Sequence, residues 1–232
     1  MATFAEYILN EPDFIKKIDI MTYLKKKQNI FFNTSVIMKA EIAREFMDTM
    51  KLDVDQGLVL TACLMYDCLK IDSPEELVRL QKSQAEYRNY LRSLGFNDRF
   101  CKICAEHSRV GQDPSITREK ESDILELADQ FGGLIMHRSD RIAYTVPEAL
   151  EILVNKNMKN CNNIYLNTFQ EFVDIMEGIE VWWDYLQDFK KIWIVLLEMI
   201  FLVLLGKYMI LWREMKQLLL KEKPNWEWVE TY

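Results

Sequence analysis

GLVLTACLMYDCLKI, residues 57–71, is an apolar segment with the period of a helix and one acid, Asp67. On a helix, Asp67 and Lys70 share one face. The opposite face is apolar and contains Leu58, Ala62, Met65 and Leu69. The segment therefore predicts a buried helix that holds a carboxylate at its end. Such an end is typical of a core-facing metal or phosphate site, and also of an ordinary helix terminus.

The composition favours an all-α protein. Half of the 232 residues are apolar, which is enough to bury a full core without cross-links. Seven Gly and five Pro are few for this length, and Leu, Ile, Glu and Lys are the commonest residues. No alternating apolar pattern of useful length predicts a strand.

The charge limits the kinds of partner that the protein is expected to bind, and the cysteine content indicates its cellular compartment. The net charge is −7 with acids and bases interspersed, so the chain lacks the basic stripe that nucleic-acid binding requires. Five cysteines are an odd number, and no secretory signal opens the chain. We therefore expect a cytoplasmic protein that does not bind nucleic acid.

Periodicity and capping residues predict a succession of helices. Asp53 or Asp55 is the expected cap of the helix that contains residues 57–71. The other predicted helices cover residues 4–9, 13–27, 36–50, 74–93, 98–107 and 117–139, a helix that begins at Pro147 and ends before Asn160, and residues 165–176.

The last part of the chain, residues 179–232, forms a hydrophobic, Trp-rich tail. Residues 192–212 are apolar except for Glu198, Gly206 and Lys207. This length suits a bilayer span, although a mid-span Glu costs about 2–3 kcal/mol; a long core or dimer helix is the competing interpretation. All six tryptophans lie in the tail, so we expect residues 180–228 to contact a protein partner, a second copy or, through residues 192–212, a membrane surface.

Several short motifs resemble those of the HD-GYP family of phosphohydrolases. Leu64–Lys70, LMYDCLK, resembles the family's LLHDIGK signature. Five further segments resemble family motifs and follow in the family's order. Cys104–Arg109 resembles HHER, Gly111–Pro114 resembles a shortened DGSGYP loop, and Leu125–Phe131 resembles ILAVADVFDAL. Ser139–Tyr144 then resembles DRPYR, and Thr145–Leu150 resembles SPEEAL. The resemblance covers about residues 33–178. It implies an HD-domain-like helical bundle at residues 31–178, preceded by a helical segment at residues 1–30.

The same resemblance implies a site for two or three metal ions, with which active family members hydrolyse cyclic di-GMP. Asp67, His107 and Asp129 match metal ligands of the family, whereas Tyr66 and Glu106 replace histidines. The chain holds only two histidines, too few for the family's dinuclear centre. We therefore expect no metal cofactor and an inactive signalling or interaction module. The alternative is a divergent phosphohydrolase with iron or manganese at Asp67, His107 and Asp129.

Each candidate residue also has a purely structural interpretation. Asp67 and Asp129 are expected to be held in ion pairs by Lys70, Arg109 or Arg141, and His107 is expected to be hydrogen-bonded beside them. The same basic residues could instead form an anion pocket for a cyclic dinucleotide or another phosphate. That set contains Lys70, Arg109, Arg138 and Arg141.

Two further features receive structural assignments. His137, beside Arg138, is expected to face solvent. Cys101-x-x-Cys104 with His107 invites a zinc assignment, but a structural zinc site usually draws on two such pairs, so packing in the core is the favoured interpretation.

Overall fold

A computed structural model describes residues 3–27, 35–66, 84–107, 117–137 and 142–178 of this chain. The chain divides into two units, residues 1–186 and residues 187–232, and every described residue belongs to the first unit. Within the described ranges the chain is helical without β-strands, which confirms the all-α class. The HD-like arrangement and the domain boundaries near residues 30 and 178 stay predictions.

The described ranges contain a succession of α-helices. Their bounds are α1 Phe4–Asn10, α2 Phe14–Lys27, α3 Ser35–Thr49, α4 Gln56–Met65, α6 Gln84–Ser93, α7 Asp98–Ala105, α8 Lys120–Leu134, α9 Val146–Ile152 with a π-helical turn at Leu153–Asn157, and α10 Leu166–Glu177.

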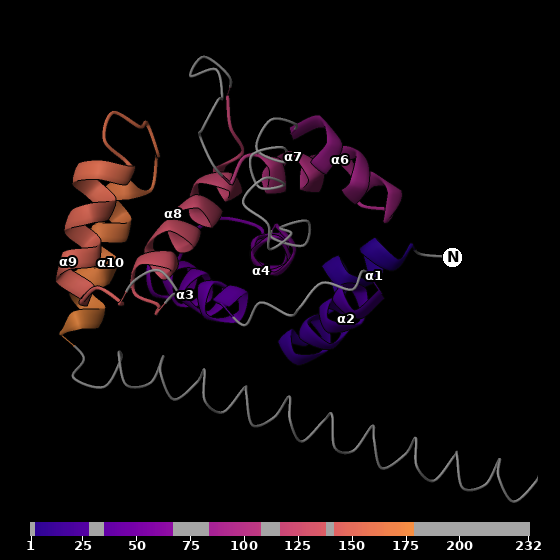
Figure 1. Cartoon of the computed structure of the whole chain (residues 1–232), viewed down its shortest axis with the longest axis horizontal. Helices are drawn as coiled ribbons and strands as arrows, with labels where there is room; N and C mark the ends of the chain where they lie inside the picture. Colours follow the sequence, from indigo (N-terminus) through magenta and orange to yellow (C-terminus); the bar gives the residue numbers. More distant parts are fainter. Residues whose placement is uncertain (1–2, 28–34, 67–83, 108–116, 138–141, 179–232) are drawn as a thin grey trace, which may run out of the picture. The chain divides into compact units, whose positions relative to one another are not determined.

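Helix α4 is the element around which its neighbours pack. It contacts α1, α2, α3, α7 and α8 (Figure 1). Asp55 begins the helix by accepting a hydrogen bond from the Leu58 N–H at 3.0 Å, as the sequence predicts. Seven of the ten residues of α4 are buried, so its apolar sequence is explained by burial on most of its circumference.

The C-terminal helix of the described region is attached through aromatic side chains. Phe169 on α10 is fully buried and packs edge-on against Phe46 of α3 and Phe131 of α8, with ring centroids 4.9 and 5.3 Å apart. Phe172 lies 5.3 Å from Phe46 in the same cluster. These contacts hold α10 against α3 and α8 and complete the core on that side.

Helix α8 is shorter than the sequence indicates. The prediction placed it at residues 117–139, but it begins at Lys120 and ends at Leu134. At its start, Lys102 Nζ donates to the Thr117 carbonyl at 3.2 Å. At its end, the Leu134 carbonyl accepts from the Tyr144 N–H at 3.1 Å. Contacts with distant residues therefore fix both ends, and local propensity does not reveal them.

The membrane question concerns residues that the structure does not describe. Among the helices in the described ranges, none combines the length and the apolarity needed to cross a bilayer. The candidate span at residues 192–212 and the rest of the Trp-rich tail lie outside the described residues.

Candidate functional site

Three polar side chains meet where α3, the end of α4 and α8 come together. Lys39 Nζ donates to the Tyr66 hydroxyl at 2.6 Å and to Asp129 Oδ1 at 2.7 Å. The Tyr66 hydroxyl donates to the same Asp129 oxygen at 2.5 Å. We call this set the Lys39–Tyr66–Asp129 cluster. A cation and a phenol therefore share one carboxylate oxygen in the core.

The cluster is buried and is tied to the packing of α3 on α8. Lys39 is 6% exposed and Tyr66 2% exposed, while the Asp129 side chain keeps 15% exposure. Helix α8 has glycine at position 132, opposite the stem of Lys39. A Cβ atom at Gly132 would lie only 2.7 Å from Lys39 Cγ. The absence of a side chain at this position is what lets Lys39 pass close to α8.

Electrostatics favour an ionised Asp129. Burial opposes its charge, but the Lys39 ammonium, the hydrogen bonds from Lys39 and Tyr66, and the nearby His107 together hold the pKa of Asp129 below its usual value. Cys63 shows the opposite behaviour, because burial raises the pKa of its thiol. The carboxylate is thus stabilised as an anion, whereas the thiol stays protonated and unreactive.

A pH dependence follows from the lowered pKa of Asp129. The ionised Asp129 stabilises the folded state at pH values above about 3.9, the pKa of an Asp carboxyl in an unfolded chain. This stabilisation is lost as the pH falls through the lower pKa that Asp129 has in the folded chain. From about pH 5 to about pH 2, the free energy of unfolding should fall more steeply for the wild type than for Asp129→Asn. Urea unfolding across this range measures the two slopes, and equal slopes would contradict the ion pair.

His107 lies beside the cluster. Its ring packs against the Tyr66 ring with centroids 5.0 Å apart and planes inclined by 52°. Its Nδ1 lies 2.7 Å from the Cys104 carbonyl oxygen, and a carbonyl only accepts, so Nδ1 carries the proton. His107 is therefore hydrogen-bonded to the end of its own helix, whereas its expected place beside Arg109 stays a prediction because Arg109 lies outside the described residues.

Among the described residues, the cation that pairs with Asp129 is Lys39. The expected partners Lys70, Arg109 and Arg141 lie outside the described residues, so their pairing with Asp129 stays a prediction. The sequence reasoning overlooked Lys39 because it was treated as one residue in the amphipathic pattern of residues 36–50. A signal was nevertheless present, since Lys39 is preceded by Val36-Ile37-Met38 and followed by Ala40, which places a lysine inside an apolar run.

Glu106, which the motif resemblance predicts to replace a histidine, has different partners. Its Oε2 accepts hydrogen bonds from the Ser122 hydroxyl at 2.6 Å and from the Glu119 N–H at 3.3 Å. Lys102 Nζ lies 3.7 Å from the other carboxylate oxygen. Glu106 is therefore used to join the end of α7 to the start of α8.

The structure also locates the cysteines and the second histidine. Cys101 and Cys104 are free thiols buried in the core, in agreement with the packing interpretation. His137 is exposed as expected. In the described parts of the chain, no three His, Cys, Asp or Glu side chains are grouped closely enough to hold a metal ion.

The remaining candidates fall outside the described residues. They are the acid Asp67 and the proposed phosphate-binding residues Lys70, Arg109, Arg138 and Arg141. Their roles stay predictions.

Comparison with known proteins adds no relative. The chain matches no family model, no curated protein and no solved structure.

Proposed function

We propose that this chain is a catalytically inactive, HD-GYP-like helical domain that acts as a signalling or protein-interaction module. The observation that carries the proposal is the Lys39–Tyr66–Asp129 cluster. Asp129 matches the late metal-binding aspartate of the family motifs, and Tyr66 stands in place of a metal-binding histidine. Both belong to a hydrogen-bonded network that contains the Lys39 ammonium. An amine of the protein itself supplies the positive charge that metal ions supply in the active family members.

The ammonium group disfavours a metal ion at the same carboxylate. A divalent cation on Asp129 would lie within a few ångströms of Lys39 Nζ, which is 2.7 Å from Oδ1. At about 4 Å and an effective dielectric constant of about 20, each pair of unit charges repels by about 4 kcal/mol. Metal binding would therefore require Lys39 to move or to lose its proton.

The alternative is a divergent metal-dependent phosphohydrolase that uses Asp67, His107 and Asp129. It is supported by the packing of His107 on Tyr66 and by the electrostatic influence of His107 on Asp129. Two of the three candidate ligands thus lie in one region of the fold. The third, Asp67, follows Tyr66 directly in the sequence.

Metal analysis separates the two proposals. The full chain, produced with iron and manganese in the growth medium, should contain far less than one metal ion per chain and should not hydrolyse cyclic di-GMP. Mass spectrometry of the metals in the purified protein gives the ratio. Stoichiometric iron or manganese that is lost in Asp67→Ala would overturn the proposal of a metal-free module and favour the divergent phosphohydrolase.

The ligand and partner of the proposed module are inferred from sequence alone. A cyclic dinucleotide is the expected small ligand because its phosphates suit the basic set at Lys70, Arg109, Arg138 and Arg141. Residues 180–228 are the expected surface for a protein partner or a second copy, because the tryptophans are concentrated there.

A further inference from the structure

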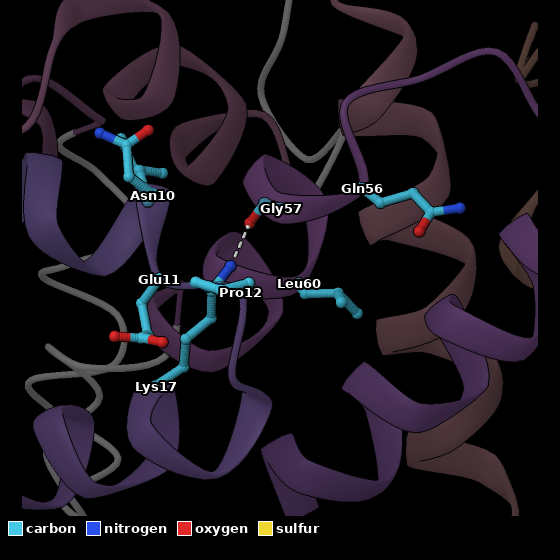
Figure 2. Close-up of a pocket in the computed structure, with 8 residues that line it drawn as sticks. Asn10, Glu11, Pro12, Lys17, Gln56, Gly57 and Leu60 are labelled. Carbon is cyan, nitrogen blue, oxygen red and sulfur yellow. Dashed lines mark hydrogen bonds between the residues drawn. The ribbon is translucent and has the colours of Figure 1, made fainter.

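A pocket of about 220 Å³ lies apart from the residues of the proposed function. It is a half-open pocket lined by the end of α1, the start of α2 and the first turns of α4 (Figure 2). One buried water needs only about 10–15 Å³ of such space, so the pocket has room for a small organic molecule. Its lining contains one base, Lys17, and one acid, Glu11.

Lys17 has an unused donor at this pocket. The residue is 3% exposed, and its Nζ donates to the Gly57 carbonyl and the Thr61 hydroxyl, each at 3.1 Å (Figure 2 shows the first bond). Both acceptors are neutral, and in the described ranges no carboxylate lies within ion-pair distance of Nζ. An ammonium has three N–H donors, so one remains for a ligand. Burial lowers the pKa of Lys17, partly opposed by Asp55 and Glu11, and a bound anion would offset that desolvation.

Glu11 has an unused acceptor. Its side chain is 8% exposed, and its Oε1 accepts the Asp13 N–H at 3.1 Å and lies 3.8 Å from Lys16 Nζ. Within the described residues, Oε2 makes no hydrogen bond. Because a carboxylate oxygen is a strong acceptor, this atom can accept a hydrogen bond from a cationic group of a ligand.

The two helix ends at the pocket have opposite polarity. Helix α1 ends at Asn10, with the partial negative charge of its last carbonyls, whereas α4 begins at Gln56, with a partial positive charge. The ends come close together, since a Cβ atom at Gly57 would lie 3.4 Å from the Leu9 carbonyl oxygen. Glu11 therefore lies at the end of α1 and Lys17 beside the start of α4, where Asp55 Oδ1, the cap of α4, also lies 3.6 Å from the position of a Cβ atom on Gly57.

From this arrangement we propose that the pocket binds a small zwitterion, an aliphatic α-amino acid. The ligand carboxylate accepts from Lys17 at the start of α4, and its ammonium group donates to Glu11 at the end of α1. The apolar side chain packs against the remaining lining, which includes Leu9, Pro12 and Leu60. A simple anion fits less well, because Glu11 would repel it. The pocket lining contains one acid, Glu11, and one base, Lys17, so it is complementary to a ligand that carries one positive and one negative charge.

Calorimetric titration of the full chain tests the ligand class. L-alanine, L-valine and L-leucine are titrated together with two analogues of leucine that each lack one charge, 4-methylpentanoate and 3-methylbutylamine. We expect at least one amino acid to bind, and the matching single-charge analogues to bind at least about tenfold more weakly, which is about 1.4 kcal/mol. The proposal is overturned if no amino acid binds at millimolar concentration, or if 4-methylpentanoate binds as tightly as leucine.

Variants test the site. Glu11→Gln keeps the shape of the side chain and should weaken amino-acid binding about tenfold, whereas 4-methylpentanoate, which Glu11 repels, should bind more tightly to this variant than to the wild type. In Gly57→Ala, the added methyl meets only ordinary contacts of 3.4–3.6 Å, one of them with Lys17 Nζ, so the protein should fold and lose the ligand. Gly133→Ala is the matched control, because nothing lies within 4 Å of its added Cβ. Unchanged binding by Gly57→Ala would place the ligand elsewhere and refute the assignment.

Discussion

Replacement of Lys39 by methionine should lower the free energy of unfolding by about 3–5 kcal/mol. The substitution keeps most of the buried stem but removes the ammonium that contacts Asp129 and Tyr66 at 2.7 and 2.6 Å. Asp129 would then be a buried carboxylate without its cation, and the cost of that uncompensated charge dominates the effect. Urea unfolding followed by circular dichroism measures the change.

Two further variants give this prediction its controls. Lys16→Met removes an exposed lysine of the N-terminal region that lies 3.8 Å from Glu11, and it should cost at most about 1 kcal/mol. The double variant Lys39→Met, Asp129→Leu removes both charges and should recover much of the loss, since buried ion pairs are often replaceable by apolar residues. If Lys39→Met were no more harmful than Lys16→Met, the cluster would not be a stabilising feature of the fold.

Gly132→Ala should destabilise the chain by about 1–3 kcal/mol, the range observed for overpacked cores. The new Cβ atom would lie 2.7 Å from Lys39 Cγ and 3.7 Å from Lys39 Cα, so α3 and the stem of Lys39 must shift. That shift should also lengthen the hydrogen bonds of the Lys39–Tyr66–Asp129 cluster. Thermal and urea unfolding report the loss of stability, and the near-ultraviolet circular dichroism of Tyr66 and its neighbours reports the repacking.

The adjacent glycine provides the comparison. A Cβ atom at Gly133 meets nothing within 4 Å, and alanine is favoured over glycine inside a helix by about 0.5–1 kcal/mol. Gly133→Ala should therefore be neutral or stabilising. Equal effects of the two substitutions would mean that helix propensity, and not the close approach of Lys39, controls this part of α8.

The sequence predicts local features of the fold well. The predicted helix at residues 36–50 is observed at Ser35–Thr49, and the helix predicted at residues 165–176 is observed at Leu166–Glu177. The predicted cap at Asp55 is also present. These features depend on side chains only a few residues apart, which are recorded directly in the order of the residues.

Features that depend on distant contacts were not predicted. Lys39 and Asp129 are 90 residues apart, and nothing in the local pattern indicates that they meet. The ends of α8 were missed for the same reason, because Lys102 and Tyr144 determine them from outside the helix. The motif resemblance predicts Tyr66 in place of a metal-binding histidine, but it does not indicate the bond from Tyr66 to Asp129, which depends on the packing of α4 against α8.

The 90-residue separation of Lys39 from Asp129 also affects how the nascent chain can fold on the ribosome. Lys39 and Tyr66 are synthesised well before Asp129, and synthesis proceeds at about 5–20 residues per second. For several seconds, the emerging α3 and α4 have an ammonium group but not its counterion, so burying that face would be costly. Stable docking of these two helices must therefore wait until α8 has left the exit tunnel.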